Sequence, residues 1–205
     1  MAQSAWIRAT GKRRFRMKIL VTAFGPFDGR LENASLLALR GLMKIFPQLR
    51  TRILPVDSMV APARLRQAMK TIRPDALVML GEAAGSSEIR LETTAWNELD
   101  FRIPDIAGRQ PSPRQIVATA PASLSSTLPL EAIHQKLAEQ GHEVRFSNDP
   151  GRYLCNQVFF TARHFLETGA VTCPAGLIHL PLERDYPTGR AVAALAEVMG
   201  VLMTR

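Results

Sequence analysis

Cysteine is scarce in this 205-residue sequence, which contains only Cys155 and Cys173. Two cysteines this far apart cannot build the disulfide framework of a small secreted domain, and neither joins a histidine at zinc-site spacing. The sequence also lacks any apolar run near the roughly 18 residues that suggest a membrane-spanning helix. These absences predict a reduced, cytoplasmic protein with no metal site and no membrane partner.

Acidic residues are missing from residues 1–16, which carry five of the 26 lysines and arginines. The remaining 21 basic and 18 acidic residues leave a net charge of +3, against +8 for the whole chain. The basicity is therefore a property of this segment. A leader ahead of a start at Met17, a transit-like peptide and a nucleic-acid arm all fit it. We favour a disordered extension without a nucleic-acid partner, because runs of charge are usually only solvated.

What the sequence does contain, from Met17 onward, is an alternation of apolar strands and amphipathic helices. Asn33 is a good N-cap for one of these helices. We expect strands at 18–24, 51–56, 76–80, 143–147 and 175–181, and helices at 34–46, 61–72, 129–141, from Cys155 onward, and at 188–203. This alternation predicts a single α/β domain over residues 17–205, with a twisted, mostly parallel sheet between two layers of helices.

In sheets of this kind, functional residues gather at the carboxyl ends of the strands. The segment SNDPGRYLCN puts Cys155 within about the first turn of a helix that follows such a strand. A helix N-terminus stabilises a thiolate through its dipole and its free N–H groups, and the same groups can stabilise an oxyanion. The alternative is a small buried hydrophobe, which is the usual role of a free cysteine and the one we assign to Cys173.

A nucleophilic cysteine needs a base, and His179 is the best placed of the four histidines. It ends the apolar strand GLIHLP, whose end should approach the start of the Cys155 helix. A hydrogen-bonded core histidine fits the same position. A carboxylate should orient the imidazole, and the candidates are Glu82, Glu92, Asp100 and Asp105. The pattern alone does not choose among these four.

Four segments of the sequence resemble the signature blocks of the pyroglutamyl peptidase I family of cysteine peptidases. They are KILVTAFGPFDG, LETTAWNELDFRIPD, SNDPGRYLCN and GLIHLP, and they occur in the order found in that family. The resemblance implies an enzyme that removes an N-terminal pyroglutamyl residue from peptides without a metal or a cofactor. It also implies a homo-oligomer, either a dimer or a tetramer.

The same resemblance assigns roles to individual residues. Cys155 matches the nucleophile of the family, His179 its general base and Glu92 the group that orients the histidine. Four further residues match positions that line or border the substrate pocket: Phe24, Phe27, Asn33 and Arg102. Pyroglutamate is an uncharged lactam, so two aromatic rings and backbone hydrogen bonds are suitable groups to recognise it.

Two rival functions compete with this interpretation. An amidotransferase-like amidase also uses Cys, His and Glu, but it holds its cysteine in a Gly-x-Cys-x-Gly elbow, and Cys155 is flanked by Leu154 and Asn156. A weakly active homologue that binds pyroglutamyl peptides is the other rival. The chain departs from the family pattern at Glu82, at Ser86 and in the short segment after Pro181.

Overall fold

A computed structural model describes residues 17–204, so the segment 1–16 and its expected disorder lie outside the described residues. The strands are β1 (Ile19–Phe24), β2 (Arg50–Leu54), β3 (Ala76–Glu82), β4 (Ile89–Glu92), β5 (Thr94–Trp96), β6 (Ser123–Ser125), β7 (Val144–Ser147) and β8 (Ala175–Leu180). The helices are α2 (Ala34–Ile45), α3 (Val60–Ile72), α4 (Leu130–Glu139), α5 (Leu154–Glu167) and α6 (Thr188–Met203).

Six strands form one sheet in the order β2-β1-β3-β8-β4-β7. The first four run parallel, β4 runs antiparallel to β8, and β7 runs parallel to β4. The expected mostly parallel sheet is confirmed, with one reversal at its β4 side. Only residues 83–88 connect β3 to β4, too few for the crossover that a parallel return requires, so β4 runs back along the sheet.

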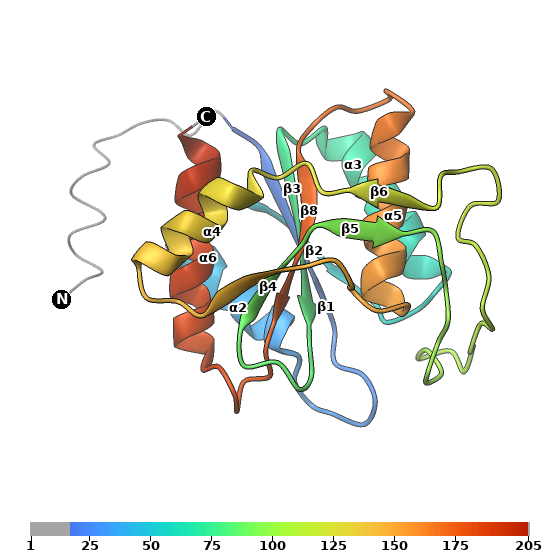
Figure 1. The fold of residues 1–205 in the computed structure, drawn as a ribbon, viewed down its shortest axis with the longest axis horizontal. Helices are drawn as coiled ribbons and strands as arrows, with labels where there is room; N and C mark the ends of the chain where they lie inside the picture. The colour runs from blue at the N-terminus through green and yellow to red at the C-terminus, as the bar shows by residue number, and fades with distance from the viewer. Residues whose placement is uncertain (1–16, 205) are drawn as a thin grey trace.

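The helices cover both faces of this sheet, as the alternation predicted (Figure 1). Helices α2, α4 and α6 pack against one face, and α3 and α5 pack against the other. Strand β1 illustrates the division, because Ile19 and Val21 point into the first core and Leu20 into the second. Side chains alternate between the two faces of a strand, and both faces of β1 are buried, which explains its unbroken apolar run.

The ends of two helices agree closely with the sequence. Asn33 caps α2, where its side-chain Oδ1 accepts a hydrogen bond from the backbone N–H of Ser35 at 3.0 Å. Helix α6 has the bounds that its pattern predicted.

No helix among residues 17–204 combines the length and apolar character needed to cross a membrane.

A short antiparallel ribbon, formed by β5 and β6, lies outside the main sheet and packs against α5. The chain between these two strands, residues 97–122, contains no further strand or helix. The ribbon continues directly from β4 and thereby brings the segment after Glu92 alongside the start of α5.

Candidate active site

Cys155 is the second residue of α5, whose N-terminus carries no side-chain cap. The first N–H groups of a helix have no partner within it, so the first turn of α5 presents free donors next to the thiol. Cys155 is also partly exposed to solvent. The sequence predicted this placement, and it gives the sulfur both access to a substrate and the positive end of a helix dipole.

His179 lies near the end of β8, and Glu92 is the last residue of the neighbouring strand β4. The Nδ1 atom of His179 is 2.8 Å from Oε1 of Glu92, and both side chains are buried. His179 is the hydrogen-bond partner of the Glu92 carboxylate, whose other oxygen has none among the described residues. This contact orients the ring so that Nε2 is the nitrogen left for another group.

Cys155 contacts the other side of the imidazole. Burial by itself lowers the pKa of His179, but the charge and hydrogen bond of Cys155 and those of Glu92 outweigh burial and raise this pKa to about 9. Near neutral pH, His179 is therefore protonated and lies between the side chains of Cys155 and Glu92. A cysteine next to a protonated imidazole is an arrangement that can supply both a nucleophile and a proton donor.

The other three carboxylates considered from the sequence have different partners. Glu82 forms an ion pair with Arg30 and accepts a hydrogen bond from the N–H of Ala34 at 2.6 Å. Asp105 accepts from the N–H and the hydroxyl of Ser58, and Asp100 is exposed. Only Glu92 of the four contacts His179 within the described part of the chain.

Gly81 forms the floor beneath Cys155 and His179, a role that the sequence analysis did not identify. It lies directly opposite His179 across the β3–β8 pair. A Cβ atom on Gly81 would lie 2.8 Å from Nε2 of His179 and 2.9 Å from Sγ of Cys155. Sγ of Cys155 and Nε2 of His179 therefore approach each other over a residue that has no room for a side chain.

We expect Gly81→Ala to lower kcat/KM by about 10²-fold, because a displacement of about 1 Å between reacting groups has an effect of that size. The methyl group has to push the imidazole or the thiol aside. Gly189→Ala is the control, because a Cβ there meets nothing within 4 Å. Kinetics and thermal unfolding of both variants check this prediction, and parent-like activity of Gly81→Ala contradicts the close approach.

Asn156, the residue after Cys155, is a second feature that the sequence analysis missed. Its side chain is fully buried and forms hydrogen bonds with the backbone of β5 and the residues after it. Oδ1 accepts from the N–H of Trp96 at 2.8 Å, and Nδ2 donates to the carbonyls of Trp96 and Glu98. These bonds fix the start of α5 to the segment that leaves Glu92. An asparagine in the first turn of an otherwise largely apolar helix was the available signal.

Aromatic rings gather beside Cys155. Tyr153 lies two residues before it and stacks on Phe27 with ring centroids 6.1 Å apart. Phe101 also packs against Tyr153, with ring centroids 4.4 Å apart. Phe24, in contrast, is only 4% exposed and forms part of the core. Phe24 and Phe27 were expected near the site from the sequence, whereas Tyr153 was not.

The two polar residues named with them lie in different surroundings. Asn33 is buried, where its Oδ1 binds both the backbone and the hydroxyl of Ser35. Arg102 is exposed and lies in the segment after the β5 strand; its carbonyl accepts a hydrogen bond from the side chain of Gln110. Residues 17–204 contain no cluster of His, Cys, Asp and Glu that could hold a metal ion.

Cys173 lies at the opposite end of β8 from His179, just before Ala175. Burial raises the pKa of its thiol to about 11, and the nearby charge of Asp75 acts in the same direction. Cys173 therefore remains protonated near neutral pH. The two cysteines differ in position as well as in electrostatic surroundings.

Comparisons with known proteins point to one group. A family model described as pyroglutamyl peptidase matches residues 17–189. Among individual relatives, the pyrrolidone-carboxylate peptidase of Vibrio vulnificus is 38% identical over 175 residues, which cover 80% of this chain and 78% of that protein. The pyrrolidone-carboxylate peptidase of Thermococcus kodakarensis is 35% identical over 184 residues, which cover 88% of each.

Solved structures agree with these sequence matches. A mutant pyrrolidone carboxyl peptidase from P. furiosus is similar with a TM-score of 0.86 and 30% identity, covering 92% of this chain and 99% of that one. The pyrrolidone carboxyl peptidase of Thermococcus litoralis gives a TM-score of 0.82 at 30% identity, covering 90% and 92% of the two chains. The likeness thus extends over nearly the whole described fold.

Proposed function

The chain belongs to the pyroglutamyl peptidase family, and from this premise we propose that it is a cysteine peptidase that removes an N-terminal pyroglutamyl residue from peptides. The observation that carries the proposal is the convergence of Cys155 and His179 over Gly81, with Glu92 2.8 Å from the far side of the imidazole. In this proposal Cys155 is the nucleophile, His179 the acid and base, and Glu92 the residue that orients and stabilises the imidazolium.

The first half of the reaction forms an acyl-enzyme. The Cys155 thiolate attacks the carbonyl carbon of the pyroglutamyl residue, and the carbonyl oxygen becomes an oxyanion near the free N–H groups at the start of α5. His179 then donates its proton from Nε2 to the nitrogen of the leaving peptide. The C–N bond breaks, and a pyroglutamyl thioester remains on Cys155.

The second half releases pyroglutamate. His179, now neutral, removes a proton from water, and the resulting hydroxide attacks the thioester. The C–S bond breaks, the thiolate leaves, and the imidazolium is restored. Throughout both halves the side chain of Glu92 accepts the hydrogen bond from Nδ1–H, so the imidazole keeps the tautomer that acts through Nε2.

Substrate recognition in this proposal uses the rings near Cys155. The exposed part of Phe27, next to Tyr153, offers an apolar surface for the uncharged lactam ring, and the buried Phe24 belongs to the core against which Phe27 packs. Asn33 fixes the start of α2 beside the pocket. Arg102, which is exposed, is proposed to approach the scissile carbonyl or the peptide that leaves.

The direct test uses two fluorogenic amides of one amine, one acylated with pyroglutamate and one with proline. We expect release of the fluorophore from the pyroglutamyl amide and at least about 10³-fold slower release from the prolyl amide, because the prolyl ring carries a charged amine instead of a lactam carbonyl. Equal rates, or no release from either amide, contradict the proposed function.

We also propose that residues 17–205 form the catalytic domain, with 1–16 as an extension outside it. The enzyme acts as a homo-oligomer, a dimer or a tetramer; the half-exposed Ile53 on the edge strand β2 offers one apolar contact for a second copy. A cytoplasmic location suits its chemistry, because a reducing compartment protects a partly exposed thiolate from oxidation.

A further inference from the structure

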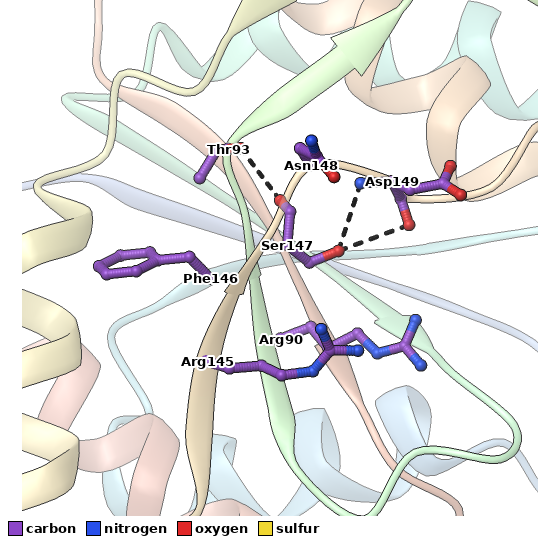
Figure 2. A pocket seen from close by; sticks show the side chains of 7 residues that line it. All are labelled: Arg90, Thr93, Arg145, Phe146, Ser147, Asn148 and Asp149. Carbon is purple, nitrogen blue, oxygen red and sulfur yellow. Dashed lines mark hydrogen bonds between the residues drawn. The ribbon is translucent and has the colours of Figure 1, made fainter.

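A cavity of about 400 Å³ opens beside the active site, along the last two strands of the sheet. Its lining comes from β4, from β7 and from the segment that leads to Cys155: Arg90, Thr93, Arg145, Phe146, Ser147, Asn148 and Asp149. Figure 2 shows the side chains of Arg90 and Arg145 lying next to each other on one side of the two strands, while the ring of Phe146 points the other way. Two cations therefore share one wall of this cavity.

The strand register connects these arginines to the catalytic histidine. Gly81, His179, Arg90 and Arg145 stand directly opposite one another across β3, β8, β4 and β7. Side chains of directly opposed residues lie on the same face of a sheet. With strands about 4.8 Å apart, the backbones of Arg90 and Arg145 lie about 5 and about 10 Å from that of His179 along this row.

The two arginines have no acidic partner among the residues that the structure describes. The Nε atom of Arg90 donates to the hydroxyl of Ser86 at 3.2 Å, which holds the guanidinium in place. Neither Arg90 nor Arg145 forms an ion pair with a carboxylate of residues 17–204. Asp149, the one acid in the described lining, is instead bound by Arg152 at 2.8 Å. Neighbouring guanidinium groups without an acid favour an anion, above all a carboxylate.

The proposed orientation of the substrate directs its leaving peptide toward this cavity. Phe27, which faces the pyroglutamyl ring in the proposed function, follows strand β1, on the far side of β3 from β8. The two arginines lie on the opposite side of His179. A substrate whose ring lies on the β1 side and whose scissile bond lies at Cys155 therefore extends its leaving part toward β4 and β7. Two or three residues of an extended peptide span the distance to Arg145.

We propose that this cavity is a subsite for the leaving peptide, in which Arg90 and Arg145 bind a carboxylate two or three residues beyond the scissile bond. The carboxylate belongs either to an acidic side chain or to the C-terminus of a short peptide. The inference rests on the proposed function, because it takes its direction from the position of the pyroglutamyl ring.

The test compares isosteric substrates: pyroglutamyl-alanyl-glutamyl amide against its glutaminyl counterpart, and pyroglutamyl-alanyl-alanine against its C-terminal amide. The first pair places a carboxylate on a side chain and the second at the chain end, so the two sources are separated. We expect the parent to favour the acidic member of at least one pair by about five- to tenfold in kcat/KM, as for a charge-assisted contact. High salt should reduce this preference.

Arg145→Met is the main variant, because Arg145 is exposed and its loss should not disturb the fold. It should reduce the acidic preference to about twofold, and Arg90→Met with Arg145→Met should abolish it. Cleavage of the neutral amides should stay within about twofold. Arg52→Met is the matched control, an exposed arginine on the opposite edge strand, and it should leave the preference unchanged.

Failure of the subsite is distinguishable from failure of the proposed function. If the neutral amides are cleaved but the acidic members gain nothing, or if Arg145→Met keeps the preference, the subsite is wrong and the peptidase activity stands. If no substrate is cleaved, the peptidase proposal fails. Calorimetric Kd values of the same peptide pairs for Cys155→Ala then decide the subsite, and equal affinities for acidic and neutral peptides overturn it.

Discussion

Cys155→Ser is expected to lower kcat/KM for a pyroglutamyl amide on the order of 10⁴-fold or more, whereas Cys173→Ser should leave it within about twofold of the parent. A serine hydroxyl is a much weaker nucleophile than the sulfur that it replaces at the start of α5, so the variant loses the group that we propose attacks the substrate. Cys173 lies at the other end of β8, and burial raises the pKa of its thiol to about 11.

Alkylation provides a second measurement of the same contrast. Iodoacetamide reacts with thiolates, so at neutral pH it should label Cys155 before Cys173, and a pyroglutamyl ligand should slow that labelling. Peptide mapping by mass spectrometry locates the label. The assignment of Cys155 as the nucleophile is wrong if the two serine variants lose similar amounts of activity, or if Cys173 is labelled first.

His179→Ala is expected to lower kcat/KM on the order of 10⁴-fold, and Glu92→Gln by a smaller factor, on the order of 10² to 10³. The alanine variant has no group to transfer a proton. The glutamine still accepts a hydrogen bond from Nδ1–H, but it stabilises the imidazolium poorly and can favour the wrong tautomer. Adding either change to Cys155→Ser should cost little more, since the three residues act as one unit.

The pH dependence separates the role of Glu92 from a merely structural one. The pKa of His179 is raised to about 9 by Cys155 and Glu92, so activity should fall as the pH rises through about 9, where the imidazolium loses its proton. Glu92→Gln removes one of the groups that raise this pKa, so its alkaline decline should begin at a lower pH. Superimposable profiles mean that Glu92 does not act on the imidazole.

Much of the fold follows from local patterns. The unbroken apolar runs of β1 and β3 predicted a sheet buried on both faces, and Asn33 marked the start of α2. The reversal at β4 was not predictable from its residues, because strand direction depends on where the chain re-enters the sheet. The short connection 83–88 was the only local sign of it.

The candidate site shows the same division between local and non-local information. The position of Cys155 at a helix start can be read from the turn residues before it, and His179 from an imidazole within an apolar strand. The choice of Glu92 among four acids needs the β4–β8 register. The close approach at Gly81 and the side-chain bonds of Asn156 to the ribbon also depend on contacts between distant segments.

Detection of the acyl-enzyme is the most direct test of Cys155 as the nucleophile. A pyroglutamyl ester with a good leaving group is mixed with the protein, the reaction is stopped with acid during turnover, and the intact mass is measured. If Cys155 is the nucleophile, the mass increases by one pyroglutamyl group, which peptide analysis maps to Cys155 and which is absent from Cys155→Ser. Rapid turnover without any adduct under conditions that make deacylation rate-limiting, or an adduct on Cys173, contradicts this assignment.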